Sequence, residues 1–395
     1  MAVHPAEPRR STPSAADGCE VTVVAHAVET GGGMESQLGL LIRGLLDEGH
    51  RVTLIARESG LPSHARLEWV RVPGIARPFS LAYPLFFLLG SLALRRRGRG
   101  IVHTTGAIVF NHADVSTVHF CHAAFERGSG GLSRAARAGL LYRLNARVGS
   151  WMSVAAERYC YRRSVTDRLV GVSVGVAREL RQAFPPMAER VEVIPNGIDR
   201  DRFAPDRQAR TTTRAELGIS DRGLVALFVG SEWERKGLAL AVEAVVAAPE
   251  WELVVVGSGD RSRFETLARE HGVAERVHLV GPHADPRRFF AAADAFVLPT
   301  AYETFSMVSF EAAAAGLPLL VTRVSGVEDL LVDGENGWFI ERAVPSITKR
   351  LAALSESGSR RSRLGANARE ATRPYSPGAV VRGYVDLYRH IAIAS

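Results

Sequence analysis

The chain has 395 residues, of which 46% are hydrophobic and 23% charged, and its formal net charge is +7. This composition is too apolar for a disordered or fibrous protein, and the length allows two ordinary domains with full cores. Three scattered cysteines are too few for a disulfide framework or a zinc site, so we expect a reducing compartment and a cytoplasmic protein.

The basic charge is concentrated in the first half. Residues 1–200 contain 25 arginines and 17 acidic residues, a balance of +8, whereas residues 201–395 contain the remaining 24 basic and 25 acidic residues, a balance of −1. Such an asymmetry is typical of proteins that meet an anionic membrane, an acidic acceptor or nucleic acid. Because no nucleic-acid-binding motif or aromatic-interleaved basic run is visible, we predict no nucleic-acid partner.

The first half reads as short strands alternating with helices. Residues 1–18 are small and polar, which predicts a disordered tail and no secretory signal. Six strands are then predicted, at residues 21–27, 51–57, 101–105, 115–120, 168–173 and 191–195.

The longest apolar stretch of the chain, residues 79–94, contains Pro84 and leads into the sequence RRRGRG. It is shorter than the ~20 residues that span a bilayer. It is therefore either a buried helix or a helix that faces a membrane surface.

The second half repeats the alternation. Five strands are predicted, at residues 224–230, 251–257, 276–281, 295–300 and 317–322. Turn-forming residues at 195–199 end the last strand of the first half, so the domain boundary is placed near residue 200. The predicted fold class is α/β, with two Rossmann-like doubly wound domains at residues 19–200 and 201–374, followed by a helical segment at residues 375–395.

The first strand of each half is followed by a loop suited to phosphate. Gly31, Gly32 and Gly33 allow the backbone to approach a ligand before a helix that starts near Met34, although a tight turn without a ligand explains the triplet as well. Arg235 and Lys236 precede a glycine and a helix, where two cations can neutralise a diphosphate. The alternative is a solvated pair of loop residues.

A third candidate segment runs from a predicted strand into a helix. Ser306 would lie near the start of this helix, where free backbone N–H groups bind phosphate oxygens. Glu311 would lie more than one turn inside and accept hydrogen bonds from ribose hydroxyls, while Glu303 would lie in the preceding loop.

Other polar residues have weaker functional readings. His103, His112, His119 and His122 cluster around the fourth strand, with only Asp114 as a nearby carboxylate, so we predict no metal site. One of these histidines either faces a ligand or belongs to the core. Asp199-Arg200-Asp201 matches the D-x-D pattern of metal-dependent sugar transferases, but it lies in the connector, where solvated acids are expected.

Taken in order, the motifs GGGME, IPNGID, FVGSEWERKG, VVGSG and YETFSMVSFEAAAAGLPLL resemble those of glycosyltransferase family 4. The resemblance covers nearly the whole chain and is strongest over residues 190–340. It implies a GT-B fold and retaining transfer of a hexose-type sugar without a metal or other cofactor. The donor, a UDP-sugar before a GDP-sugar, would bind the second domain and the acceptor would approach from the first.

The resemblance also assigns roles to residues. Glu311 looks like the ribose contact, Glu303 like the donor-sugar contact, and Arg235 and Lys236 like the pair that stabilises the leaving diphosphate. Further roles are implied for His119 as a histidine near the donor sugar, for Gly32 and Gly33 as close-approach glycines, and for the backbone of Thr304, Phe305, Ser306 and Met307 around sugar and phosphates. The last helix would cross back to the first domain. Ser231 and Glu232 stand where the family often has an arginine.

The sequence does not identify the acceptor, which is a glycan, a lipid-linked sugar or a small molecule. A role in polysaccharide biosynthesis would fit these acceptors. The basic first domain would also suit a peripheral position at the inner face of a membrane. Two other functions remain as alternatives: a sugar-nucleotide epimerase on the same fold, and a catalytically silent partner subunit that keeps the nucleotide site.

Overall fold

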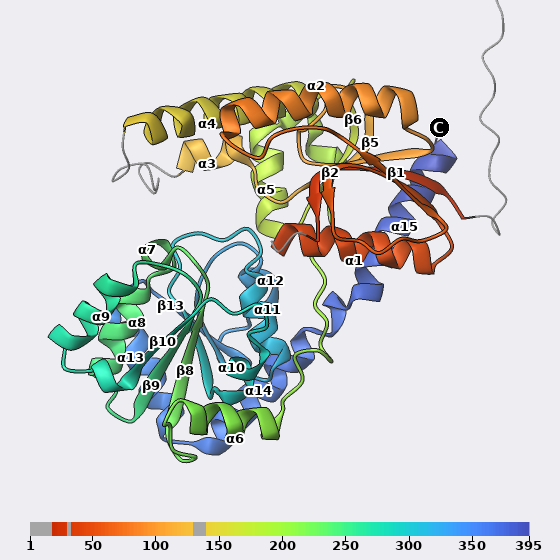
Figure 1. The fold of residues 1–395 in the computed structure, drawn as a ribbon. Coiled ribbons are helices and arrows are strands. Elements are labelled where there is room, and N and C mark those ends of the chain that lie inside the picture. The colour runs from red at the N-terminus through yellow and green to blue at the C-terminus, as the bar shows by residue number, and fades with distance from the viewer. Residues whose placement is uncertain (1–17, 30–32, 129–139, 395) are drawn as a thin grey trace, which may run out of the picture. The chain divides into compact units, whose positions relative to one another are not determined.

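The computed structural model describes residues 18–29, 33–128 and 140–394 (Figure 1). Gly32 and residues 1–17 of the predicted tail lie outside the described residues. Within the described part of the chain, no helix is both long enough and apolar enough to cross a bilayer.

The first sheet has seven strands in the order β3-β2-β1-β4-β5-β6-β7. Its strands are β1 (Glu20–Val28), β2 (Arg51–Ser59), β3 (Leu67–Arg71), β4 (Ile101–Thr105), β5 (Ala113–Val118), β6 (Thr166–Gly171) and β7 (Val191–Val193). The helices along this part of the chain are α1 (Gly33–Asp47), α2 (Phe79–Arg97), α3 (His122–Gly128), α4 (Leu140–Cys160) and α5 (Val174–Ala183), with a 3-10 turn at Pro185–Arg190. The central strand β1 pairs in parallel with β2 and β4.

The second sheet has six strands in the order β10-β9-β8-β11-β12-β13. Its strands are β8 (Leu224–Val229), β9 (Trp251–Val256), β10 (Val277–Gly281), β11 (Ala295–Leu298), β12 (Leu319–Thr322) and β13 (Gly337–Ile340). The helices are α6 (Arg207–Glu216), α7 (Trp233–Lys236), α8 (Leu238–Val246), α9 (Arg261–Glu270), α10 (Arg287–Ala292), α11 (Met307–Ala314), α12 (Val327–Leu330), α13 (Val344–Ser355), α14 (Gly358–Ala371) and α15 (Pro377–Ala394), with 3-10 turns at Ala274–Arg276 and Arg373–Tyr375.

Both sheets are covered by helices on their two faces, which is why their strands are continuous apolar runs. Figure 1 shows α2 and α4 on one face of the first sheet and α1 and α15 on the other, and it shows α8 and α9 opposite α11 and α12 across the second. Accordingly, the central strands β1, β8, β9 and β11 are buried almost completely. The predicted α/β fold class with two parallel, Rossmann-like sheets is confirmed.

Contacts divide the chain into two compact units. The first contains residues up to Thr117, Ala135–Leu169 and Val381 onward, and the second contains Val118–Arg134 and Val170–Val380. The limits at residues 200 and 374 that the sequence suggests for the domains stay predictions.

The second part of α15 belongs to the first unit, where it is held by a buried polar network. The hydroxyl of Tyr388 lies 2.6 Å from Nδ1 of His103, and Thr117 Oγ1 lies 2.7 Å from Nε2 of the same imidazole. Tyr384 completes the network through its hydroxyl, 2.9 Å from Thr117 Oγ1. His103 is therefore a core histidine with partners for both ring nitrogens.

The predicted strand counts were wrong by one in each sheet. The missed strand β3 is a short edge strand whose side chains are mostly exposed, so it has no apolar run. The missed strand β13 has only four residues and begins with a glycine. Predicted strand 115–120 also ends earlier than expected, because β5 stops at Val118 and leaves His119 in a loop.

Candidate functional site

The loop after β8 is shaped by glycine and fixed by a tryptophan. Gly230 has a φ of 143°, and a Cβ there would lie 2.6 Å from the Lys236 side chain. Trp233 is 2% exposed and its indole N–H donates to the Gly230 carbonyl at 3.0 Å. The short helix α7 then ends at Gly237, whose φ of 77° and closeness to the Pro299 carbonyl leave no room for a side chain.

This loop brings the two predicted cations to Glu303. Lys236 Nζ lies 2.7 Å and Arg235 3.5 Å from Glu303 Oε1, which also accepts a 3.2 Å hydrogen bond from the Thr300 hydroxyl. The Lys236 side chain is only 10% exposed, and that of Glu303 13%. Because Lys236 is buried and paired, it is not a solvated loop residue. The structure brings the three side chains together, and their role in binding a donor stays a prediction.

Arg235 is held by two further acceptors. Its Nε donates to Glu232 Oε2 at 2.8 Å, and its terminal nitrogen donates to the Tyr302 carbonyl. A planar guanidinium fixed at several points keeps its direction without a ligand. The acid at position 232, where an arginine was expected from the resemblance, thus orients the neighbouring cation.

The segment from Thr304 to Met307 forms the start of α11. Ser306 is its N-cap and has a left-handed backbone, with a φ of 67°. For a residue other than glycine this conformation is strained and is found most often at functional sites. Phe305 anchors the turn, because it is 2% exposed and its ring stacks on that of Phe310 at 4.1 Å. The backbone N–H groups that open α11 are therefore held in a fixed direction, and their contact with phosphate stays a prediction.

Glu311 lies in the second turn of α11, as predicted. Its carboxyl group forms no hydrogen bond or ion pair with the residues that the structure describes. Burial raises the pKa of Glu311 to about 7, and the Arg202 charge opposes this shift. A buried carboxyl group without protein partners is suited to accept hydrogen bonds from the hydroxyls of a ligand.

His119 and Gly33 are placed at sheet edges where ligands bind in parallel α/β folds. His119 follows the carboxyl end of β5, and burial lowers its pKa to about 4, so its imidazole is neutral near pH ~7. It forms no hydrogen bond or ion pair with Glu303 or the two cations in the described residues. Gly33 begins α1, one residue after Gly32, which lies outside the described residues.

Tyr302 is a neighbour that the sequence analysis did not single out. Its ring contacts those of Phe120 and Phe125, at centroid distances of 5.8 and 5.2 Å. Its hydroxyl and Glu179 Oε2 are buried and have no hydrogen-bond partner among the described residues. Only its position next to Glu303 could have marked it in advance.

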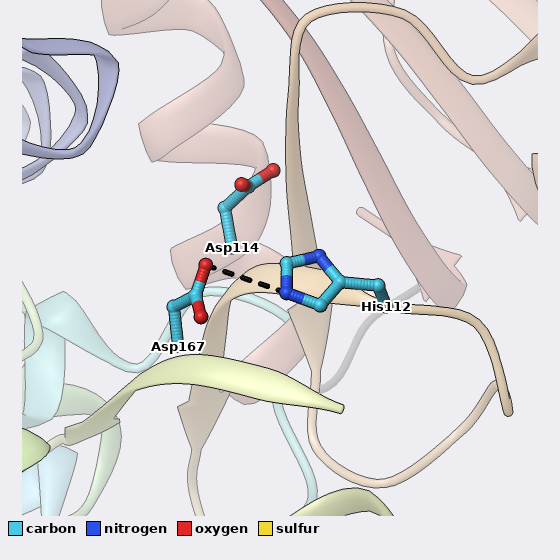
Figure 2. A group of neighbouring side chains, drawn as sticks. All are labelled: His112, Asp114 and Asp167. Carbon is cyan, nitrogen blue, oxygen red and sulfur yellow. Dashed lines mark ion pairs between the residues drawn. The ribbon is translucent and has the colours of Figure 1, made fainter. Parts of the chain in front are cut away.

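A separate polar group lies in the first unit, at the amino ends of β5 and β6. Figure 2 shows His112, Asp114 and Asp167, whose potential ligand atoms lie within 4.8 Å of one another. His112 Nε2 is 3.4 Å from Asp167 Oδ2, and Asp114 Oδ2 accepts a 2.7 Å hydrogen bond from the Val102 N–H. The sequence analysis counted Asp114 as the only nearby carboxylate, and this was wrong because Asp167 comes from the adjacent strand. His112 and Asp167 form an ion pair and Asp114 accepts a backbone hydrogen bond, and the absence of a metal site stays a prediction.

The D-x-D motif has a structural role. Asp199 Oδ1 accepts hydrogen bonds from the backbone N–H groups of Asp201 and Arg202, at 3.1 and 2.9 Å. The Asp201 side chain is fully exposed. Asp199 therefore stabilises a turn, and the exposed Asp201 lies 3.8 Å from Arg369, which fits connector residues in contact with solvent.

Comparison with known proteins gives two family matches that lie side by side in the sequence. Residues 31–202 match the model described as Glycosyltransferase Family 4, and residues 209–371 match Glycosyl transferases group 1. A D-inositol 3-phosphate glycosyltransferase of Xylanimonas cellulosilytica is 32% identical over 239 residues. The aligned part covers 57% of this chain and 57% of that relative, so the chain spans little more than half of the relative's length.

Solved structures share the fold over nearly the full chain. The crystal structure of WaaG, a glycosyltransferase involved in lipopolysaccharide biosynthesis, superposes with a TM-score of 0.75 at 23% identity, covering 93% of this chain and 99% of that one. Anabaena Alr3699/HepE in complex with UDP and glucose gives a TM-score of 0.71 at 18% identity, covering 93% and 98%. With both regions matched to glycosyltransferase families and the two-sheet GT-B fold in place, the chain belongs to the family 4-like glycosyltransferases.

Proposed function

We propose that this glycosyltransferase moves a hexose-type sugar from a UDP-sugar, or less readily a GDP-sugar, to an acceptor with retention of anomeric configuration and without a metal. The observation that carries the proposal is the ion-paired group of half-buried Arg235, buried Lys236 and half-buried Glu303. It combines two cations for a diphosphate with a carboxylate for sugar hydroxyls in one set of contacts.

The leaving diphosphate would meet Arg235, Lys236 and the N-terminus of α11. Arg235 and Lys236 are held by the Tyr302 carbonyl and by Glu303, and Ser306, the N-cap of α11, follows three residues after Glu303. Preorganised charge of this kind stabilises the negative charge that develops as the sugar–phosphate bond breaks. Thr304, Phe305, Ser306 and Met307 contribute backbone groups rather than side chains, which fits their burial or their place in the turn.

The ribose and the sugar would each meet a carboxylate. Glu311 has no protein partner in the described residues and would accept hydrogen bonds from the ribose. Glu303 would exchange its contacts with Lys236 for hydrogen bonds from sugar hydroxyls. His119, neutral because its pKa is about 4, would add a hydrogen bond near the sugar without adding charge. Gly32 and Gly33 would let the backbone approach the bound molecules.

The acceptor would be a glycan, a lipid-linked sugar or a small molecule. We propose a cytoplasmic enzyme of polysaccharide biosynthesis that associates peripherally with the inner face of a membrane. The excess of 25 arginines over 17 acidic residues in residues 1–200 supports this position.

A panel of UDP-, GDP-, ADP- and dTDP-sugars tests the donor. The purified protein is incubated with each sugar and EDTA, and thermal shift and slow hydrolysis are measured. We expect stabilisation and hydrolysis with UDP-sugars, lost in Glu311→Ala and kept in the exposed control Glu275→Ala. Indifference to every nucleotide would overturn the donor site. Binding without hydrolysis or transfer to any acceptor would favour a silent partner subunit, and loss of hydrolysis with EDTA would refute metal independence.

A further inference from the structure

An open apolar groove of about 500 Å³ lies between α2 and α4. Its lining includes Phe87, Leu88, Phe110, Trp151, Met152 and Tyr159. Trp151 is 70% exposed, Leu88 51% and Phe110 40%. Soluble proteins rarely leave a contiguous apolar patch with a large aromatic side chain in water unless something binds there.

The exposed residues follow helical spacing. On α2, Leu81, Leu88 and Leu92 recur every seven or four residues and are exposed, while Tyr83, Phe86 and Leu94 are buried in the core on the opposite face. The helix is thus apolar on both sides. One face of residues 79–94 is therefore a core face and the other is an exposed apolar face, and contact of the exposed face with a membrane stays a prediction.

α4 extends the same surface. Val148, Trp151 and Tyr159 are exposed on its outer side. The two helices pack closely, since a Cβ at Gly149 would lie 2.9 Å from the Phe79 ring and the Ser80 backbone N–H donates to Asn145 Oδ1 at 3.4 Å. Figure 1 shows α2 and α4 side by side along one face of the first sheet. Their exposed stripes therefore form one surface.

Arginines lie at the C-terminal end of α2, where Arg97 pairs with Glu68 of β3 at 3.6 Å, and the two helices themselves carry few acids. Arg95, Arg96 and Arg97 form the last turn of α2, and Arg99 follows. Residues 79–99 contain no acid, and the only acid of residues 145–163 is Glu157, which is 2% exposed. An apolar groove with a cationic edge complements molecules that carry both hydrocarbon and phosphate.

We propose that the α2–α4 surface docks on an anionic phospholipid leaflet, with acyl-chain segments in the groove and lipid phosphates on the arginines. Hydrocarbon chains can follow an irregular groove, and the volume lies within the ~300–1,000 Å³ of typical ligand sites. Nucleic acid would leave the apolar groove unfilled, and association of two copies through this surface is tested below by analytical ultracentrifugation. The inference deepens the proposed membrane position and rests on it, but not on the choice of donor.

Sedimentation of the full chain with vesicles tests the proposal. The vesicles contain phosphatidylcholine alone or mixed with phosphatidylglycerol, and a third preparation carries brominated acyl chains that quench inserted tryptophan. Leu88→Ser is matched by Val332→Ser, because both side chains are 51% exposed and Val332 lies in the other unit. The double change Arg95→Gln/Arg96→Gln is matched by Arg207→Gln/Arg222→Gln, which removes two exposed arginines of the second unit.

We expect binding to the anionic vesicles, quenching that is lost in Trp151→Phe, and weakening by added salt. Leu88→Ser should lower the partition coefficient about tenfold. The arginine pair should lower it about 25-fold, or about fivefold for each arginine near the surface. The matched controls should bind like the wild type.

Other outcomes would overturn the proposal. These are no binding to anionic vesicles, binding without acyl-chain quenching, equal effects of the matched controls, or a dimer in analytical ultracentrifugation that Leu88→Ser abolishes. Donor binding by the same variants is measured without vesicles. Variants that still bind the donor are folded. If the wild type does not bind a donor, the proposed donor site is refuted, but the vesicle-binding result is not affected.

Discussion

The pH dependence of donor binding tests the role of Glu311 most directly. Its pKa is raised to about 7 by burial, so the free protein holds this carboxyl group partly protonated near neutral pH. Hydroxyl groups that donate to the carboxylate favour its charged form and lower its pKa. Binding of a UDP-sugar should therefore release a proton, and the affinity should rise with pH across this window.

The size of the effect follows from the two pKa values. If ribose hydroxyls return the pKa from about 7 to the ordinary 4.5, Glu311 is about nine-tenths protonated at about pH 6 in the free protein and about one-tenth protonated at about pH 8. The affinity for the donor at about pH 6 is then about tenfold lower than at about pH 8. This corresponds to a difference of about 1.4 kcal/mol in binding free energy. Near pH ~7 about half a proton leaves per bound donor.

Isothermal titration calorimetry with UDP-glucose measures both quantities. Two buffers of different ionisation enthalpy report the proton release, and a nucleotide sugar avoids the terminal phosphate group that titrates near ~6. His119 does not contribute in this window, because its pKa is about 4. Glu311→Gln should remove the pH dependence, and the exposed control Glu275→Gln should keep it.

Two results would refute this reasoning. One is a wild-type affinity that changes less than about twofold across the window in which the free carboxyl group titrates. The other is an unchanged pH profile in Glu311→Gln. Either would mean that the carboxyl group of Glu311 does not meet the ribose hydroxyls.

Three further predictions concern the loop and the last helix. Lys236→Met removes the cation 2.7 Å from Glu303 and should lower the rate of sugar transfer about 100-fold or more. The rate is measured by release of the nucleotide. A rate near that of the wild type would exclude Lys236 from diphosphate stabilisation. Gly237→Ala places a Cβ 2.4 Å from the Pro299 carbonyl at a φ of 77° and should lower the free energy of unfolding by about 1–3 kcal/mol. Gly218→Ala is the control in urea denaturation, because Gly218 has a similar φ of 72° but no atom lies within 4 Å of a Cβ added there. Equal losses of unfolding free energy in the two variants would show that crowding at Gly237 is unimportant. Tyr388→Phe leaves Nδ1 of the buried His103 without its 2.6 Å partner and should cost about 1–3 kcal/mol, whereas Tyr159→Phe, which loses an exposed 3.3 Å hydrogen bond, should cost little. Similar denaturation midpoints for these two variants would contradict the importance of the buried network.

The sequence predicted the parts of the fold that depend on local pattern. Interior strands such as β1 and β9 are apolar on both faces, so the run of residues marks them directly. The edge strand β3 could not be found this way, because its exposed residues leave no such run. Likewise, α2 reads as one apolar helix, and only its packing shows which face is buried.

The candidate site also contains residues that the sequence could predict and contacts that depend on the tertiary structure. Arg235, Lys236 and Glu303 could be proposed as neighbours because each lies in a loop at the carboxyl end of a strand in one parallel sheet. The approach of Asp167 to His112 could not be proposed from spacing, because 55 residues separate them in sequence and the contact depends on β5 and β6 being adjacent. The exposure of Trp151 is also a tertiary property, since an aromatic residue in an amphipathic helix is more often buried.

The charge balance of the loop around Arg235 and Lys236 has a consequence for the proposed donor binding. Arg235 and Lys236 face two acids, Glu232 and Glu303, so the cations are already neutralised. A diphosphate bound as proposed would add negative charge, and the two cations would stabilise it more strongly if one acid gave up its contact with them. Glu303 is the acid that a sugar ligand can satisfy, because hydroxyl groups can replace Lys236 Nζ as hydrogen-bond donors, whereas Glu232 keeps Arg235 oriented. Diphosphate without a sugar would leave Glu303 buried and short of a donor, so the same contacts that hold the cations ready also favour the complete nucleotide sugar over the nucleotide alone.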